Sequence, residues 1–439
     1  MPSVTLEQAI AATRFGFGAR PSDFSAIGSD PKAWLKSQTQ PGAASQLPTA
    51  LPSFSQFTEA VWAGAALSGV TTDGLFDLDL RTRTRFSQQT TMPFRERFVH
   101  FWANHLSVAN RGELGGAAIT FEREVIRPNI MGRFEDLLVA SSAHPFMIYY
   151  LENFNSAGPN SSVAGMGSVG INENLAREIL ELHTLGVDGG YTQADVTSFA
   201  KVITGWTFSN RNNGARPYGR FYFEPAFHEP GAQTVLGTSY AQTGVDQGLA
   251  VLKALAKHPS TIDHVCIKIA QYFHSDSPPA SLVDALKSAW TATDGSLSAV
   301  ANALVDAPEM WAAEQAKVKS ADDFWVSMLR AVDAQWPADW IIMWAYIMMG
   351  APPFTAASPA GWPVASTAWA APGPLRQRIQ VTNNLCGGFA PNIPGDLVTF
   401  AQGILGPFLK PATVSQIQSA ANRNEALAIL FLSPEFQRR

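Results

Sequence analysis

The chain has 439 residues, 46% of them hydrophobic and 15% charged, and a formal net charge of −5. This length allows one large domain, or two to three smaller ones, with a sizeable buried core. The negative net charge and the lack of any run of basic residues argue against a nucleic-acid-binding protein, which normally carries a basic stripe. The two cysteines, Cys266 and Cys386, are too few for a disulfide scaffold and form no CxxC zinc motif. We expect two free, buried thiols, with one bond between them as the alternative.

The N-terminus, residues 1–7, has neither the cationic start nor the apolar run of a signal peptide. The sequence as given therefore predicts a soluble, cytoplasmic protein, unless a leader has been removed. The longest apolar stretch, Trp340 to Met349, is shorter than the roughly 20 residues that span a bilayer. We expect a buried helix at this stretch and no transmembrane segment.

Helical signals follow one another along most of the chain. Thr5 and Gln8 have the spacing of a capping box and predict a first helix, and Thr192 and Asp195 have the same spacing. Pro93 suits the first turn of a long helix. Residues 40–56 are predicted to be a loop. Further helical or apolar segments are predicted over residues 121–140, 144–153, 172–185 and, with breaks, 246–439.

Residues 218–240 differ from the rest because their apolar and polar residues alternate, which predicts a small β-hairpin. The predicted fold class is therefore mainly α, a large multi-helix globular domain with this hairpin as an insertion. We expect a single domain over residues 1–439. An alternative is a subdivision into a site-bearing helical part, 1–275, and a helical C-terminal part, 276–439.

The helix that follows Pro93 has a histidine where its pattern calls for an apolar residue. At 100° of turn per residue, Phe94, Phe98, Phe101 and neighbouring residues form one broad apolar arc, and His105 projects near its centre. His100 falls on the opposite side. We therefore predict that His100 is exposed and His105 buried. The structural alternative to a functional role is a core histidine satisfied by one backbone carbonyl.

The helix predicted over residues 172–185 breaks its pattern in the same way. Glu178 and His183 lie within the apolar arc, on its two flanks, and Glu181 borders it. A buried carboxylate is costly, so Glu178 must be paired, metal-bound or protonated. The structural alternative is a buried ion pair with Arg97 or Arg127. Glu181 has the alternative of being ordinary solvated surface.

The spacing of these residues limits their chemistry. Glu178 and Glu181 lie one turn apart, and two close carboxylates raise one pKa, which suits a general acid beside a base. Glu178 and His183 are five residues apart, about 140° around the helix, so they do not readily ligate one metal together. A metal site would combine Glu178 with His105 and with His183 or His228.

Motifs spread along the chain resemble one bacterial family. The central motif is the run from Asn172 to Val196, and the match is long enough to be specific. The other matching segments are Phe101–His105, Thr204–Trp206, Phe227–His228, His258–Pro259, Lys268–Ala270, Pro308–Met310, Lys317–Lys319 and Gly361–Pro363. On these residues the chain resembles the eighteen-hundredth domain-of-unknown-function family of bacteria over nearly its whole length.

The resemblance implies a mainly helical protein without an agreed activity. Members of this family are often exported, so the resemblance implies a periplasmic location if a leader was removed. They often neighbour a second family that resembles sulfatases and alkaline phosphatases, which implies a sulfatase-like neighbour as a partner and glycans or envelope polymers as substrates. This chain departs from the family in having no leader and in having Glu229, where members tend to have Asp, after His228.

Three functions follow as hypotheses. The first is a hydrolase of a glycan or related polymer, with Glu178, Glu181 and His105 as its catalytic residues. In that hypothesis the residues predicted to bind the substrate are Asn104, Asn174, Arg177, Trp206 and His228. The second is a metal-dependent oxidoreductase or hydrolase with His105, Glu178 and His183 as ligands of a divalent or redox metal ion. The third is a non-enzymatic assembly partner in which buried polar residues fix helix packing.

Overall fold

The computed structural model describes residues 4–42, 47, 50–67, 69–166, 170–333 and 338–439. Helices dominate it, and its strands form two small antiparallel sheets of two strands each. The predicted mainly α fold with a small β-hairpin is confirmed. No helix in the described part of the chain is both long and apolar enough to cross a membrane.

The helices of the first half are α1 (Leu6–Ile10), α2 (Asp23–Ile27), α3 (Pro31–Ser37), α4 (Phe54–Ala63), α5 (Leu75–Gln89), α6 (Pro93–His105), α7 (Arg127–Asn129), α8 (Phe134–Ala143), α9 (Pro145–Tyr150), α10 (Asn174–Glu178) and α11 (Gln193–Val202). Those of the second half are α12 (Val245–Ala256), α13 (Pro259–Phe273), α14 (Ala280–Ala292), α15 (Leu297–Asp306), α16 (Ala321–Val332), α17 (Asp339–Met348), α18 (Ser366–Trp369), α19 (Pro372–Phe389), α20 (Leu397–Leu405), α21 (Pro411–Ser419), α22 (Arg423–Leu432) and α23 (Pro434–Gln437). Short π-helical turns are η1 (Ala11–Phe15), η3 (Glu122–Ile126) and η5 (Ile179–His183). Short 3₁₀ turns are η2 (Gly115–Ala117), η4 (Asn153–Asn155), η6 (Pro225–Phe227), η7 (Pro308–Trp311), η8 (Ala390–Asn392) and η9 (Gly406–Phe408).

Local sequence signals set several helix starts. The Thr5 side chain caps α1 and Gln8 completes the reciprocal bond of a capping box. The Thr192 hydroxyl and the Asp195 carboxylate do the same for α11. Pro93 occupies the first turn of α6, where its missing N–H leaves no helical bond unmade. Both cysteines are free and buried, as predicted.

The strands differ in one respect from the predicted hairpin. β3 (Gln233–Val235) and β4 (Thr238–Tyr240) form the expected hairpin. β2 (Phe221–Phe223), however, pairs with the upstream strand β1 (Trp206–Phe208). Alternation indicates that a segment is a strand, but its partner depends on what it can pack against, and here β1 is fully buried.

The apolar stretch near residue 340 is helical, as predicted, but it is only half buried. In α17 the side chains Ile341, Ile342 and Tyr346 are buried, whereas Trp340 is 67% and Ile347 60% exposed. The prediction of a buried helix is therefore wrong for one face. The reason is that α17 packs on α5, α16 and α19, and these contacts leave Trp340 and Ile347 exposed.

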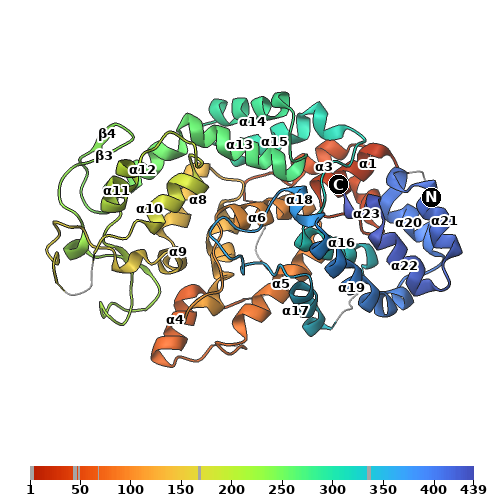
Figure 1. Ribbon diagram of the computed structural model, residues 1–439, viewed down its shortest axis with the longest axis horizontal. Coiled ribbons are helices and arrows are strands. Elements are labelled where there is room, and N and C mark those ends of the chain that lie inside the picture. The colour runs from red at the N-terminus through yellow and green to blue at the C-terminus, as the bar shows by residue number, and fades with distance from the viewer. Residues whose placement is uncertain (1–3, 43–46, 48–49, 68, 167–169, 334–337) are drawn as a thin grey trace.

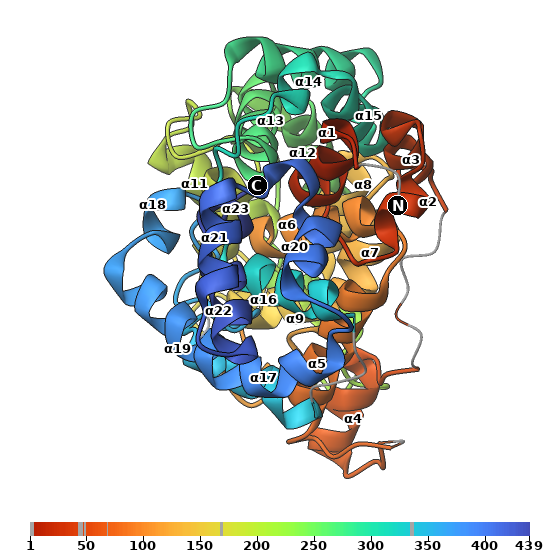
Figure 2. The ribbon, with the colours of Figure 1, turned by 90° about the vertical axis from the view of Figure 1, so that its right-hand side faces the viewer.

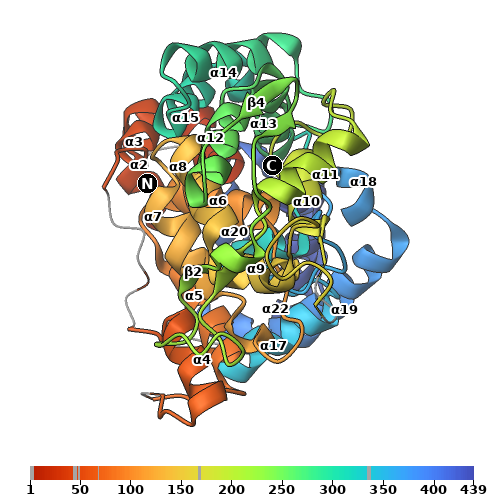
Figure 3. The same cartoon turned by 90° about the vertical axis from the view of Figure 1, so that its left-hand side faces the viewer.

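Elements from distant parts of the chain meet around α6, which lies near the middle of the molecule (Figures 1 and 3). The strands and α9–α12 lie toward one end, and α19–α23 lie toward the other (Figure 1). Helix α5 contacts α16 and α17, and α1 contacts η9. The C-terminus lies beside α23 (Figure 2). These contacts join elements before residue 275 to elements after it. The alternative subdivision of the chain at that residue stays a prediction.

Candidate functional site

Glu178 ends α10, at the point where the helix passes into the π-helical turn η5. Its side chain is half-buried, and among the described residues it has no hydrogen bond or ion pair. Burial and the charge of Glu181 raise the pKa of Glu178, and the charge of Arg177 lowers it less. Glu178 is therefore a half-buried carboxyl group with a raised pKa and no described partner.

The alternative of a buried ion pair for Glu178 does not fit the contacts of the two arginines. Arg97 donates to the carbonyl oxygens of Arg14 and Gly16. Arg127 is bound to Glu96 and Glu122. Neither cation is paired with Glu178, although Nε and Nη2 of Arg97 have no hydrogen-bond partner among the described residues.

The other predicted residues of this helix form a ladder on its outer face. Arg177 Nη2 lies 2.9 Å from Glu173 Oε2, and Arg177 Nη1 lies 3.4 Å from Glu181 Oε1. Asn174 is exposed at the helix start. Glu181 also hydrogen-bonds Tyr191, whose pKa is raised to about 12 by burial and by that carboxylate. Glu181 thus has an ion pair, which Glu178 lacks among the described residues.

Tyr150, at the end of α9, supplies a hydroxyl near Glu178. This hydroxyl is buried and has no partner in the described chain. Burial raises the pKa of Tyr150, the charge of Arg111 lowers it, and the charge of Glu178 raises it again. Tyr150 and Glu178 are therefore close enough to interact, a proximity that the sequence did not indicate.

His105 and His183 are brought together, but through a backbone contact. His105 Nε2 lies 3.2 Å from the carbonyl oxygen of His183. Burial, followed by the charges of Lys268 and His264, lowers the pKa of His105 well below its ordinary value. Its predicted burial is confirmed, and its setting matches the structural alternative of a core histidine bound to one carbonyl.

His183 is 1% exposed, and neither ring nitrogen has a hydrogen-bond partner among the described residues. Burial and the charge of Lys268 lower the pKa of His183 to about 3. His264 completes the cluster, with Nε2 3.3 Å from the carbonyl oxygen of Leu182 and a pKa lowered to about 4 by burial and by Lys268. At neutral pH this cluster consists of uncharged imidazoles beside one lysine.

The remaining predicted site residues lie elsewhere. His228 Nδ1 lies 3.0 Å from the carbonyl oxygen of Thr204. Trp206 is fully buried in β1 and packs against Gly248, where an added Cβ would meet the indole ring at 2.4 Å. In the described part of the chain, no group of three or more His, Cys, Asp or Glu side chains is arranged to hold a metal ion. The geometry therefore gives the metal hypothesis no support.

His100 corrects a prediction, because it is only 5% exposed instead of lying on the surface. Helix α6 is buried on all sides, so its polar face meets a second polar surface and not water. His100 Nδ1 lies 3.0 Å from Asp322 Oδ2, and its Nε2 lies 3.7 Å from Glu96 Oε1. Burial and Arg83 lower the pKa of His100, but Asp322 and Glu96 outweigh them and raise it.

His100 is one member of a closed ring of six ionisable side chains from α5, α6, η3, α7 and α16. Each member contacts the next, at distances from 2.6 to 3.7 Å, in the order Arg83, Glu122, Arg127, Glu96, His100, Asp322 and back to Arg83. Three carboxylates face two arginines, so a protonated His100 brings the ring to neutrality. The raised pKa of His100 agrees with this balance of charge.

Ser87, His100 and Asp322 have the connectivity of a catalytic triad. Ser87 Oγ lies 3.0 Å from His100 Nε2, on the side of the ring opposite Asp322. Two observations argue against a nucleophilic serine. Ser87 is 0% exposed and donates to the carbonyl oxygen of Arg83. A protonated His100 would donate to Ser87 and could not take its proton.

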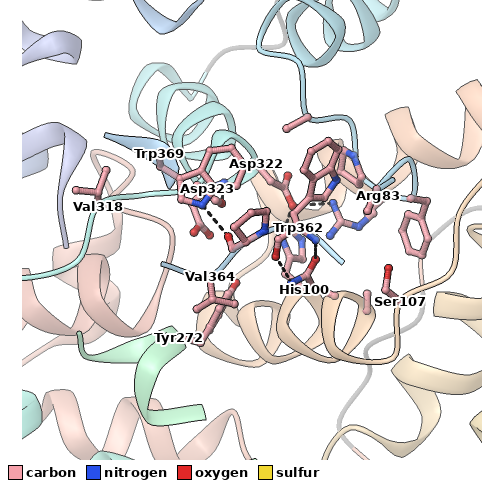
Figure 4. A pocket seen from close by; sticks show the side chains of 18 of the residues that line it. Arg83, His100, Ser107, Tyr272, Val318, Asp322, Asp323, Trp362, Val364 and Trp369 are labelled. Atoms are coloured by element: carbon pink, nitrogen blue, oxygen red, sulfur yellow. Dashed lines mark hydrogen bonds and ion pairs between the residues drawn. The ribbon is translucent and has the colours of Figure 1, made fainter. Parts of the chain in front are cut away.

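A pocket opens beside the ring, between α6, the N-terminus of α16 and the segment 351–369. Arg83, His100 and Ser107 lie toward one side of this pocket, and Tyr272, Asp323 and Val318 toward the other (Figure 4). Counted with its opening to solvent, the hollow has a volume of about 730 Å³. Of the predicted site residues, only Asn104 lines it.

Asn104 acts in this pocket by holding its wall. Its Nδ2 donates to the carbonyl oxygen of Trp362 at 2.9 Å, and its Oδ1 accepts from the Trp362 N–H at 2.7 Å.

The sequence analysis missed Arg83, Glu122 and Asp322. The signal that singled out Glu178, a charge on a helix face that must be buried, was also present at Arg83 in α5 and Glu122 in η3.

The fold and the site define a mainly helical protein with a buried ionic ring, an adjoining pocket and a separate half-buried carboxyl group. Residues 10–438 match the family described as Protein of unknown function (DUF1800), and the chain belongs to that family. No curated protein and no solved structure matches the chain.

Proposed function

We propose that the protein is a hydrolase of a glycan or related polymer and that Glu178 is its general acid. The observation that carries the proposal is the state of Glu178. Its carboxyl group is half-buried, has no described partner, and has a pKa raised by burial and by Glu181. A carboxyl group whose pKa is raised by burial and by a neighbouring charge is a candidate for proton transfer.

The chemistry of glycoside hydrolysis suits two unequal carboxyl groups. One must be protonated to donate to the leaving oxygen, and the other must be ionised to activate water or to stabilise the sugar cation. Glu178 has no ion pair among the described residues, whereas Glu181 has Arg177 at 3.4 Å. This difference supports Glu178 as the acid and Glu181 as the ionised partner. The Tyr150 hydroxyl and Arg111 add polar groups at the same place.

The test compares Glu178→Gln with Glu181→Gln, and with Glu173→Gln as the matched control from the same helix. The wild-type protein is assayed for new reducing ends on a panel of polysaccharides. Glu178→Gln should lower kcat by about 10²–10⁴-fold, because a general acid contributes that much. Glu173→Gln removes a half-buried carboxylate that binds Arg177, Gln193 and Thr197 outside the proposed acid–base pair, and it should leave kcat unchanged.

A folding measurement separates this outcome from simple damage. Because the folded environment disfavours the charged form of Glu178, Glu178→Gln should be at least as stable as the wild type at neutral pH. Full turnover by Glu178→Gln on a substrate that the wild type cleaves would refute the assignment.

The assembly hypothesis has one observation in its favour. Trp340 and Ile347 on α17, together with Leu375 and Ile379 on α19, are large apolar side chains that remain exposed on two contacting helices. A bound partner protein would cover such a patch. Under this second proposal, Trp340→Glu would abolish co-purification of a partner, and Glu178→Gln would change no activity.

A further inference from the structure

The pocket beside the ionic ring has a wall of aromatic side chains that is fixed in advance. Asn104 holds the backbone of Trp362 by two hydrogen bonds, and the Asn110 N–H donates to the carbonyl oxygen of Phe354 at 2.7 Å. The indole N–H groups of Trp362 and Trp369 are bound to the carbonyl oxygens of Pro352 and Pro363. Because these polar atoms are already satisfied, the tryptophans offer apolar ring faces.

The charged side chains around the pocket compensate one another. Arg83 is bound to Glu122 and Asp322, and His100 contacts Asp322. The Arg439 guanidinium is paired with Asp323. A charged ligand would lose its hydration here without meeting a free counter-charge, and that loss is costly. The pocket therefore favours a neutral ligand.

Asp322 nevertheless offers hydrogen-bonding capacity. Its side chain is 20% exposed, whereas those of Arg83, His100 and Arg439 are 2–3% exposed. A carboxylate accepts about four hydrogen bonds. Oδ2 contacts Arg83 and His100, and Oδ1 accepts from the Tyr346 hydroxyl, so one acceptor position remains on Oδ1. The hydroxyl of Ser107, also in the lining, has no described partner.

From these contacts we infer that the pocket binds a neutral sugar ring. A pyranose presents an apolar C–H face, which suits the aromatic wall, and hydroxyl groups, which can donate to Asp322 and exchange hydrogen bonds with Ser107. The inference does not rest on the proposed hydrolase activity, because Glu178 and Glu181 do not line this pocket.

The test is a binding measurement on the full chain, by calorimetry or ligand-observed NMR. The probes are the methyl pyranosides of glucose, galactose and mannose, with glucuronate and glucosamine as charged analogues. At least one neutral pyranoside should bind saturably, and more tightly than its charged analogues. Ser107→Ala should weaken that binding about two- to tenfold, the value of one hydrogen bond.

Ser142→Ala is the matched control, since Ser142 is a buried serine of α8 whose hydroxyl also has no described partner. It should leave sugar binding unchanged.

Trp362→Ala should weaken sugar binding roughly tenfold or more. Trp362→Phe should weaken it less, because phenylalanine keeps an aromatic face. If Trp362→Ala does not fold, Ser107→Ala still decides the question.

Three results would overturn the inference. They are no saturable binding of any neutral pyranoside, tighter binding of a charged analogue, and binding that neither Ser107→Ala nor Trp362→Ala weakens. Failure of sugar binding leaves the proposal for Glu178 standing, because that proposal is measured by turnover. Loss of turnover in Glu178→Gln with intact sugar binding supports both.

Discussion

His183 shows how far a single residue can depart from its ordinary chemistry. Its ring is buried beside the half-buried Lys268, and neither nitrogen has a partner in the part of the chain that the structure describes. The pKa of His183 is lowered to about 3. A buried polar group without a hydrogen bond costs about 1–3 kcal/mol. The fold therefore tolerates a neutral imidazole at this point but disfavours a charged one.

This state predicts acid sensitivity that one substitution relieves. Between pH 6.5 and about 3 the unfolded chain binds a proton at His183 and the folded chain does not, so stability falls as the pH falls through that window. His183→Leu removes this loss. When the pH is lowered from 7 to 5, the wild type should therefore lose about 2 kcal/mol more free energy of unfolding than the variant, since one pKa unit is worth about 1.4 kcal/mol.

Urea unfolding of both proteins at several pH values checks this prediction. The comparison at pH 8 is the control, because His183 is uncharged there in both states and the difference reports packing alone. An identical pH dependence in the two proteins would show that His183 is not the group that titrates.

At the scale of elements, the segment 351–369 depends on one close backbone approach. Gly361 has φ +75°, and a Cβ at this position would meet the backbone oxygen of Asn104 at 2.5 Å. That approach allows the Asn104 side chain to hydrogen-bond both the backbone N–H and the carbonyl oxygen of Trp362. Gly361 thus determines the position of the pocket wall, although it does not line the pocket itself.

Gly361→Ala should therefore be far more harmful than an ordinary substitution of a left-handed glycine. Gly395 has φ +72° with nothing within 4 Å of an added Cβ, so Gly395→Ala is the matched control. The control should lose about 1 kcal/mol of unfolding free energy from backbone strain alone. Gly361→Ala should lose roughly 3 kcal/mol or more and should also weaken ligand binding in the pocket. Equal losses in thermal unfolding would contradict the role of the Asn104 contact.

At the scale of the whole molecule, the ionic ring joins segments that are distant in sequence. Arg83, His100, Glu122 and Arg127 belong to the first third of the chain, and Asp322 belongs to α16. Removing one partner from a buried ionic network leaves the others uncompensated in a medium of low dielectric constant. The ring therefore makes the packing of these helices specific.

Glu122→Gln tests this role without changing the shape of the side chain. It should lower the free energy of unfolding by about 3–5 kcal/mol, because Arg83 and Arg127 each lose a buried counter-charge. Glu173→Gln, which breaks the partly exposed pair with Arg177 but leaves an amide that can still hydrogen-bond Gln193 and Thr197, should change it by less than about 1 kcal/mol. Chemical denaturation measures both values, and a small effect of Glu122→Gln would contradict the role of the ring.

The sequence by itself determined the features that depend on neighbours along the chain. The capping boxes at Thr5 and Thr192, the helical period around Glu178, the burial of His105 and the mainly α fold all follow from local spacing. The tertiary structure decided what each of these surfaces meets. It buried His100 in an ionic ring, left Glu178 half exposed beside Tyr150, and exposed one face of α17. The physical reason is that helical periodicity fixes which side chains share a face, whereas burial and charge pairing depend on contacts between segments hundreds of residues apart, such as Arg83 with Asp322.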